Sequence, residues 1–303
     1  MIARYHRLLW ITVPPAIGIY ALDRKLSDLE ARYPALPVDR STCSAALCTP
    51  NAPATQHVAY VDIYAARVNC TGLVKRGEPL TPQIFNRVKA EFFRSGGEAW
   101  AVAVLTSRIM WTEGCIIGLL SGRGWNPGDI GRSVEGFGPV CADALPIKSA
   151  PGAGASTKDM ERKKKKRELL HGALTVECPP MPDNPYGLLV SWKLPDGPRL
   201  FFEKIARWGY PWRLMSGGRH ELSMSEPYYV PGRESEGMFF DLRFSSAHDY
   251  EIVPEEGGIE KQKTIPKWIA RLHRGYARWI LDRAARDFRS SLRRVANRQR
   301  RRA

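Results

Sequence analysis

The clearest hydrophobic pattern in the chain is an apolar stripe near its C-terminal end. From Ile265 onward, apolar residues recur every three or four positions, at Trp268, Leu272, Tyr276, Trp279, Ile280, Ala284, Phe288, Leu292 and Val295. This spacing is that of one helix face, and about 30 residues at about 1.5 Å each give roughly 45 Å. The pattern predicts one long helix whose stripe packs on the core. Membrane-surface binding is the alternative, because the opposite face is rich in arginine.

A second pattern, in which apolar and polar residues alternate, predicts strands. Leu222 and Met224 alternate with serines, and the three apolar residues of 240–244 alternate with polar ones. Such alternation is typical of antiparallel strands with one buried face. Ser245-Ser246-Ala247 is a candidate turn between the last two strands. The predicted strands are His57–Val68, Gly172–Cys178, Gly187–Lys193, Arg219–Val230, Met238–Ser245 and Asp249–Val253.

Two helices are predicted between the first strand and the later ones. Thr81-Pro82 has the residues of a helix start, and Gly96-Gly97 those of its end. A second helix is predicted from Glu98 to about Trp111.

The glycine-rich segment at residues 115–131 follows these helices. It contains neither GxxxxGK[ST] nor GxGxxG, so it does not predict a phosphate-binding loop. We interpret it as the end of a strand or helix followed by a turn-rich loop, in which Arg123 and Asp129 can pair with each other.

An uncharged apolar run, Leu8–Leu22, lies between basic residues near the N-terminus. It is shorter than the roughly 20 residues of a spanning helix, and it contains Pro14-Pro15. We interpret it as a single-pass anchor on an internal membrane, with the folded domain on the cytosolic side. A cleaved signal peptide and a buried or surface-lying helix are the alternatives.

These patterns divide the chain into four parts. Residues 1–25 form the anchor segment, and residues 26–56 form a linker with a short helical piece at Ser27–Arg32. Residues 57–292 form a single α+β domain, interrupted by a flexible basic insertion at 145–170. Residues 293–303 form a basic tail.

The positive charge of the chain is concentrated in short segments. The formal net charge is +15, and basic runs lie at Arg162–Arg167 and Arg293–Arg302. Such runs are either solvated segments or contacts to anionic lipid head groups. Nucleic acid is the least favoured partner, because no recognition fold accompanies the charge.

The cysteines predict neither a metal site nor a disulfide framework. The six cysteines form no CxxC pair, and none lies at zinc-ligand spacing from a histidine. We therefore expect no metal, and with no nucleotide loop present we expect no cofactor.

The order of predicted elements resembles a known superfamily. The run EKIARWGYPWRLMSGGRHEL, then FFDLRFSSAHDYE and the final helix, are similar to the START-like, helix-grip superfamily of polyketide cyclases and lipid-transfer domains. The resemblance covers roughly residues 57–292. It implies a curved antiparallel sheet, two early helices and one long C-terminal helix gripped around an apolar cavity. The chain also resembles, more loosely, fungal proteins that accompany biosynthetic gene clusters. The insertion and the anchor depart from the superfamily's compact form.

The candidate site lies mainly within Arg199–Tyr229, where aromatic rings adjoin Arg219, His220 and Glu221. Apolar walls with a few polar groups are typical of a ligand pocket. Because neighbouring strand residues point to opposite faces, His220 shares the face of Leu222 and Met224, whereas Arg219 and Glu221 do not. Candidate catalytic residues are His220, His248 and Glu203, and candidate ligand-binding residues are Trp208, Tyr210, Trp212, Arg219 and Tyr250.

Two functions follow from these features. The first is a cofactor-independent enzyme, of cyclase, isomerase or dehydratase type, acting on a lipophilic polyketide- or terpenoid-like metabolite in fungal secondary metabolism. Such an enzyme would work by positioning its substrate in a shaped apolar pocket. The second is a non-catalytic lipid or small-molecule carrier at a membrane surface, which would need no acid or base in the same pocket.

Overall fold

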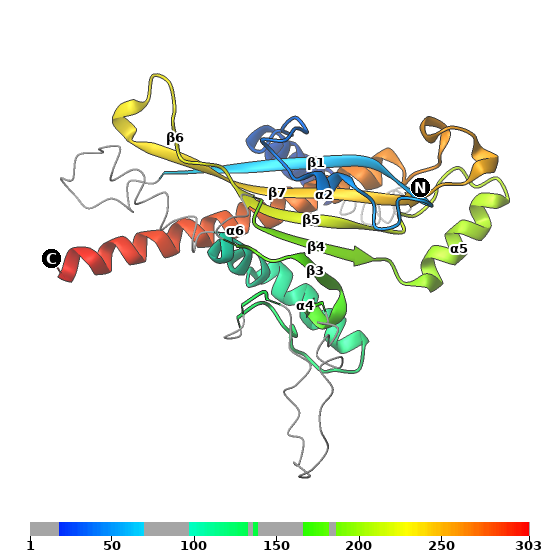
Figure 1. The fold of residues 1–303 in the computed structure, drawn as a ribbon, viewed down its shortest axis with the longest axis horizontal. Coiled ribbons are helices and arrows are strands. Elements are labelled where there is room, and N and C mark those ends of the chain that lie inside the picture. The colour runs from blue at the N-terminus through cyan, green and yellow to red at the C-terminus, as the bar shows by residue number, and fades with distance from the viewer. Residues whose placement is uncertain (1–17, 70–96, 133–135, 139–165, 182–185, 303) are drawn as a thin grey trace, which may run out of the picture.

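The fold is built on one antiparallel sheet. The computed structural model describes residues 18–69, 97–132, 136–138, 166–181 and 186–302. The sheet has seven strands in this part of the chain: six pair in the order β1-β7-β5-β4-β3-β2, and the seventh, β6, pairs with β7 at one end (Figure 1). The strands are β1 Gln56–Asn69, β2 Glu168–Leu169, β3 Leu174–Cys178, β4 Leu188–Lys193, β5 Gly217–Met224, β6 Tyr228–Tyr229 and β7 Met238–Glu251.

One long helix, α6 (Lys267–Arg302), lies against this sheet and confirms the helix predicted from the apolar stripe. It contacts β1 and β7. The α+β class, the antiparallel sheet and the long C-terminal helix are therefore confirmed. The buried face of the helix is made of small and apolar residues that admit close contact, namely Ala277, Ile280, Leu281, Ala284, Ala285 and Phe288.

The turn predicted at Ser245-Ser246-Ala247 is wrong, because β7 continues without interruption through these residues. Ser246 pairs with Asp62 of β1 on one side and with His220 of β5 on the other. Backbone pairing on both sides holds this segment extended in the middle of the sheet, where the local preference of serine for turns is overridden. The same continuity places His248 on the face that packs against α6.

Two short helices cover the other end of that face. The structure has a helix at Gly97–Leu105 and α4 at Arg108–Leu120, bent by 57° relative to each other. The helix predicted at Glu98–Trp111 is therefore divided at residues 106–107. The reason is Ser107, whose side chain accepts a hydrogen bond from Met110 N and caps α4. The helix predicted from Thr81 to Gly96 lies outside the described residues.

The core lies between the sheet and these helices. Trp100 is completely buried, stacks edge-on against Phe288, and donates Nε1–H to Arg243 O at 3.0 Å. A smaller cluster lies on the opposite face of the sheet, beneath α2 (Ala45–Cys48), and includes Leu47 and Ile63. The sheet is therefore covered on both faces.

Residues 26–56, which we expected to be a linker, are packed on the domain. A helix occupies residues 18–32, and its Leu26 and Leu29 are buried. Arg278 of α6 donates to Tyr33 O at 2.8 Å, which fastens the end of this helix. Ser27 lies within the helix and donates to Asp23 O, so it does not begin a helix as predicted. Residues 1–17, and with them most of Leu8–Leu22, lie outside the described residues.

No single helix in the described part of the chain is long and apolar enough to cross a bilayer. The bent pair Gly97–Leu105 and Arg108–Leu120 meets the length and composition criteria only when its two helices are taken together.

After α4, the chain turns through a loop, as predicted for the glycine-rich segment. Gly122 and Gly128 have φ values of +71° and +70°, which glycine adopts readily. The predicted pairing of Arg123 with Asp129 is wrong. Asp129 binds Arg167 at 2.7 Å, and Arg123 donates to His171 O at 3.3 Å.

Among the described residues, the remaining elements are one helix and four short 3₁₀ turns. The helix α5 (Asp196–Arg207) connects β4 to β5 and was not predicted. The 3₁₀ turns are η2 Leu170–Gly172, η3 Glu234–Glu236, η4 Pro254–Glu256 and η5 Ile259–Lys261.

Candidate functional site

An apolar cavity of about 560 Å³ lies between the sheet, α4 and α6. This size is within the range typical of small-molecule sites. Its polar end is formed by Trp192, His220 and His273. Its walls are largely aliphatic and include Val104, Leu105, Met110, Ile117, Leu174, Leu188, Val190, Leu222, Phe244, Ala277 and Ile280.

Strand alternation and helix periodicity bring these side chains together. Leu188, Val190 and Trp192 are two residues apart on β4, so they point to one face. Leu222 and His220 pair with Leu188 and Val190 and point to the same face. On α6, His273 is followed by Tyr276, Ala277 and Ile280, the spacing of one helix face. The cavity is therefore fixed by regular structure.

Three histidines gather at the polar end of the cavity. His248 Nε2 lies 2.7 Å from His273 Nε2, so one imidazole donates to the other. Ser246 Oγ lies 3.2 Å from His248 Nε2. The ring of Tyr60 stacks on His248 with centroids 4.5 Å apart. His248 therefore contacts β1 through Tyr60 and α6 through His273, and it does not itself line the cavity.

The ring of His220 is held between aromatic neighbours. Its centroid lies 6.0 Å from the Trp192 ring, with the planes nearly parallel, and 5.3 Å from the Phe244 ring. His220 Nδ1 and Trp192 Nε1 are buried and have no hydrogen-bond partner among the described residues. A buried polar atom without a partner costs about 1–3 kcal/mol. These two atoms are therefore the unsatisfied polar atoms of the residues that form the polar end.

Burial keeps the histidines neutral. It lowers the pKa of His220 to about 3, and His273 adds to the effect. Burial and the neighbouring His273 and His220 lower the pKa of His248 to about 2. Burial and Arg274 also lower the pKa of His273. A neutral imidazole has one donor and one acceptor nitrogen, so the histidines suit an uncharged polar group. Lys193 also lines the cavity, next to Trp192.

A second polar pair lines the cavity beside α4. Tyr276 donates its hydroxyl to Glu113 Oε2 at 2.7 Å. Burial, followed by the charge of Glu113, raises the pKa of Tyr276. The pair joins α4 to α6.

Arg219 and Glu221 point away from the cavity, as predicted from strand alternation. Arg219 makes two hydrogen bonds to Asp249, at 2.7 and 2.8 Å, and donates Nε–H to Leu47 O at 2.9 Å. Glu221 accepts from Ser44 N at 3.1 Å. These buried groups fasten residues 44–51 to the sheet, so the predicted ligand-binding residue Arg219 is not in contact with the cavity.

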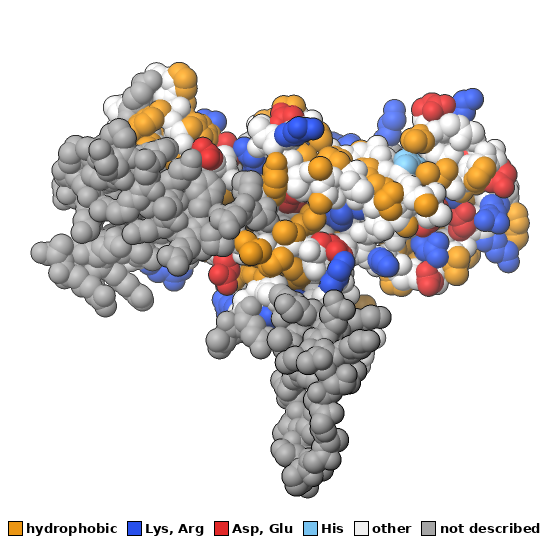
Figure 2. All heavy atoms as spheres, viewed as in Figure 1, with side chains coloured by type: hydrophobic (Ala, Val, Ile, Leu, Met, Phe, Trp, Pro, Cys, Tyr) orange, Lys and Arg blue, Asp and Glu red, His pale blue; other side chains and the backbone are white. Residues whose placement is uncertain are grey.

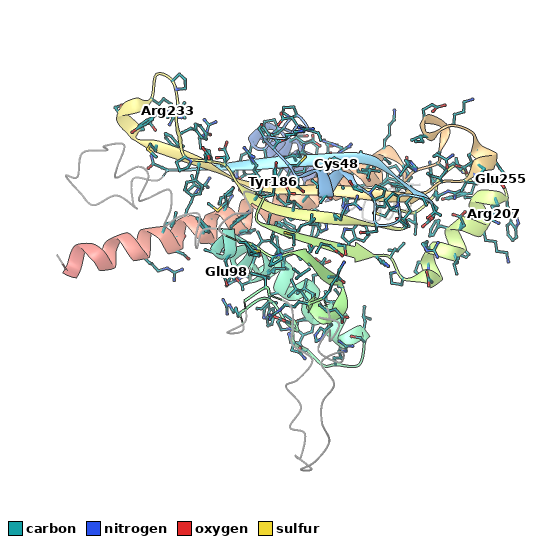
Figure 3. The ribbon with its side chains drawn as sticks, in the orientation of Figure 1. Cys48, Glu98, Tyr186, Arg207, Arg233 and Glu255 are labelled. Carbon is teal, nitrogen blue, oxygen red and sulfur yellow. The ribbon has the colours of Figure 1, made fainter. Side chains whose placement is uncertain are left out.

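The aromatic segment around α5 does not line the cavity either. Trp208 is 75% exposed and Trp212 is 37% exposed, and Tyr210 packs on Trp212. Glu203 on α5 forms an ion pair with Arg213, which also binds Glu256. Figure 3 shows the nearby Arg207 and Glu255 at one end of the molecule. The structure therefore does not bring Glu203, Trp208, Tyr210 and Trp212 together with the histidines.

Tyr250 is buried on the histidine side of the sheet but lies outside the cavity lining. Its hydroxyl accepts a hydrogen bond from Ile265 N at 3.4 Å, just before α6 begins. Its ring centroid lies 6.5 Å from that of Tyr60. Tyr250 therefore supports the ring that stacks on His248.

Sequence reasoning missed Trp192, His273 and Tyr276 as site residues. Trp192 lies in a strand that was predicted, at the position where an alternating pattern turns it inward. His273 begins the i, i+3, i+4, i+7 series on α6, which was the available signal.

The described side chains that could bind a metal ion do not cluster as a metal site would require. Within the described ranges, no group of three or more His, Cys, Asp or Glu side chains is arranged to hold a metal ion.

In comparisons with known proteins, no protein-family model, curated protein or solved structure matches this chain.

Proposed function

We propose that this protein binds a lipophilic small molecule in the cavity between the sheet and α6. The observation that carries the proposal is the combination of aliphatic walls with the unpartnered His220 Nδ1 and Trp192 Nε1 at one end. The neutral histidines favour a hydroxyl or carbonyl group over a charged one. A polyketide- or terpenoid-like metabolite has this chemistry.

The START-like, helix-grip assignment is part of the same proposal. Its support is the element order: β1, a pair of helices, a run of antiparallel strands and a final long helix over the same sheet face. An association with an internal membrane would suit an apolar ligand, and it rests on the sequence of Leu8–Leu22 and the basic runs.

A nucleic-acid function is less well supported. On the face seen in Figure 2, blue Lys and Arg side chains are interspersed with red Asp and Glu side chains. A nucleic-acid interface is typically a continuous basic patch or stripe.

Binding can be tested with Nile red, a neutral apolar dye, because the cavity can be filled by one substitution. Ala277→Phe places a ring in the cavity, whereas Ala31→Phe adds the same ring at an exposed position of the helix at residues 18–32. We expect the wild type and Ala31→Phe to bind the dye equally, and Ala277→Phe to bind at least about tenfold more weakly. Absence of saturable dye binding by the wild type, or equal binding by both variants, would contradict the proposal.

The polar end can be tested separately by competition. We expect a long-chain alcohol to displace the dye better than the alkane of the same length, because its hydroxyl can hydrogen-bond to the imidazole of His220. Replacing His220 by Phe should reduce the ratio of alcohol affinity to alkane affinity about tenfold, and should leave alkane binding unchanged. An unchanged preference in the variant would exclude His220 as the ligand's polar partner.

A cofactor-free enzyme of the cyclase, isomerase or dehydratase type is the second candidate. The observation in its favour is the direct hydrogen bond between His248 and His273, since neighbouring imidazoles can pass a proton. The lowered histidine pKa values make weak bases, so the geometry supports binding more strongly than proton transfer. In an assay with a polyketide-like precursor, replacing His220 and His248 together should abolish turnover. Precursor left unchanged by the wild type would contradict catalysis.

A further inference from the structure

A second concave site lies at the edge of the sheet, beside β1. It is a groove of about 570 Å³ between the end of the helix at residues 18–32, β1 and α6. It shares no lining residue with the histidine cavity. We call it the arginine groove, after its charged residues Arg32, Arg67, Arg286, Arg289, Asp241 and Asp282.

The groove carries more positive than negative charge. Its four guanidinium groups and two carboxylates leave a formal surplus of two positive charges. Arg289 donates to Arg67 O at 2.7 Å and forms no ion pair with a carboxylate among the described residues. Four different segments of the chain, namely the helix at residues 18–32, β1, β7 and α6, contribute these charges, so the fold itself gathers them.

A buried aspartate holds two of the arginines in place. The side chain of Asp282 is 4% exposed and accepts from Tyr33 Oη at 2.8 Å and from Arg32 at 3.1 Å. Its other oxygen lies 2.7 Å from Arg286. Burial opposes ionisation, but the hydrogen bond from Tyr33 and the charge of Arg286 outweigh it and lower the pKa of Asp282. The carboxylate therefore fixes these side chains as a charged scaffold.

The same arginines keep donors for a ligand. The side chains of Arg32, Arg67 and Arg286 are 50%, 48% and 49% exposed. The Nε–H of Arg67 donates to Tyr228 Oη at 2.8 Å, and the same nitrogen lies 3.6 Å from Asp241 Oδ1. Because a guanidinium carries five N–H donors in a planar fork, each side chain retains donors beyond those used in the protein.

We propose that the arginine groove binds the dianionic phosphate group of a phosphate monoester. Arginine forks match the spacing of phosphate oxygens and bind them in pairs. A dianion neutralises the surplus of two positive charges, whereas a single carboxylate neutralises half of it. The volume exceeds that of phosphate alone, so the organic part of the ester also fits. The ester is a phosphorylated metabolite or the head group of a lipid, since both present the same chemistry.

The two sources are separated by using the full chain with two probes at about 150 mM salt. Glycerol 3-phosphate is the soluble probe, measured by calorimetry. Phosphatidylcholine vesicles containing phosphatidic acid are the lipid probe, compared with vesicles of equal charge containing phosphatidylserine. Binding of the soluble ester indicates a metabolite site. A preference for the phosphatidic acid vesicles over the phosphatidylserine vesicles, without binding of the soluble ester, indicates a lipid head-group site.

A charge-matched pair of variants tests the groove itself. Arg286→Gln with Arg289→Gln removes the surplus from the groove, whereas Arg283→Gln with Arg294→Gln removes two exposed charges elsewhere on α6. We expect the groove variant to bind glycerol 3-phosphate at least about tenfold more weakly, or to lose the preference for phosphatidic acid vesicles, and the control to stay within about twofold of the wild type. Thermal unfolding checks that both variants are folded. Equal loss in both variants, or a wild type that neither binds glycerol 3-phosphate nor prefers phosphatidic acid vesicles, would overturn the proposal.

Discussion

At the scale of single residues, Glu221 is an unusual carboxylate because it is completely buried and has no cationic hydrogen-bond partner among the described residues. It accepts from the backbone N–H of Ser44, at 3.1 and 3.3 Å. Burial raises its pKa to about 7, whereas a carboxyl in an unfolded chain titrates near about 4.3. The unfolded chain therefore releases this proton first, and the stability of the fold falls as the pH rises from about 4.5 through about 7.

Replacing Glu221 by Gln should remove this loss. Between about pH 5 and about pH 8 we expect the free energy of unfolding of the wild type to fall by on the order of 2–3 kcal/mol more than that of the variant. Urea unfolding at both pH values measures the difference. Glu255→Gln, at an exposed position, is the control and should follow the wild type. An equal fall in all three proteins would show that Glu221 is ionised in the folded state.

The buried histidines predict the opposite trend in acid. Their pKa values in the fold lie below the ordinary value of about 6.5, so stability is complete above about pH 6.5 and is lost as the pH falls. His220→Phe removes one of these groups. Below about pH 6, the free energy of unfolding of this variant should fall less steeply than that of the wild type, by up to about 1.4 kcal/mol per pH unit. A slope equal to that of the wild type would contradict a neutral, buried His220.

How far the site could be predicted depends on where its residues lie in the sequence. Strand alternation was sufficient to place His220 beside Leu222 and away from Arg219, because that rule is local. The contact between His248 and His273 joins β7 to α6 across 25 positions, and no local pattern encodes it. Its aromatic neighbours in the sequence predicted that Trp208 binds a ligand, but Trp208 lies at the end of α5 and is exposed to solvent. Composition alone does not distinguish an exposed aromatic residue from a cavity wall.

At the scale of elements, Gly187 sets how closely β4 approaches β5. Its φ is +69°, and a Cβ there would lie 2.2 Å from Leu222 O. Gly122 has a similar φ of +71° with nothing within 4 Å. The two glycines therefore have nearly the same φ, but only at Gly187 would an added Cβ clash with neighbouring backbone.

This difference predicts unequal effects of alanine. Gly122→Ala should cost about 1 kcal/mol from the left-handed conformation alone. Gly187→Ala should cost at least about 3 kcal/mol, because the backbone of β5 must move. Chemical unfolding of the two variants measures both values. If the two losses are equal, the close approach of β4 and β5 is not what requires glycine at position 187.

The elements themselves were largely predictable where the pattern was long. The apolar stripe predicted the helix α6, and the run His57–Val68 predicted the strand β1, and both elements formed as expected. The errors occurred where tertiary pairing decides the backbone. Ser246 lies in a turn-like triplet but pairs with β1 and β5 on both sides. Likewise, the segment after Pro195 contains several aromatic residues typical of strands, yet it forms α5.

At the scale of the whole molecule, the N-terminal region must be divided into two parts. The helix at residues 18–32 belongs to the domain, because Leu26 and Leu29 are buried and a Cβ at Gly275 would lie 2.1 Å from Leu26. Arg271 of α6 also pairs with Glu30 at 3.0 Å. Of the proposed anchor segment, only the residues before this packed part of the helix are therefore free to lie in a membrane.

This division predicts different outcomes for two truncations. A chain that begins at Gly18 should stay folded and lose membrane association, because it lacks Leu8–Ile17 but keeps Leu26 and Leu29. A chain that begins at Pro34 should be destabilised by several kcal/mol, since it loses both buried leucines and the hydrogen bond from Tyr33 Oη to Asp282. Thermal unfolding measures folding, and flotation with vesicles measures association.

The arginine groove provides the control for the membrane result, because it remains complete in the chain that begins at Gly18. Vesicles of phosphatidylcholine alone lack phosphate monoesters, so only the apolar run can bind them. We expect the full chain, and not the Gly18 truncation, to float with these vesicles. If the truncation floats equally well, the apolar run is not the anchor. If it binds only vesicles that contain phosphatidic acid, and loses that binding with Arg286→Gln and Arg289→Gln, the groove holds the domain on the lipid surface independently of Leu8–Leu22.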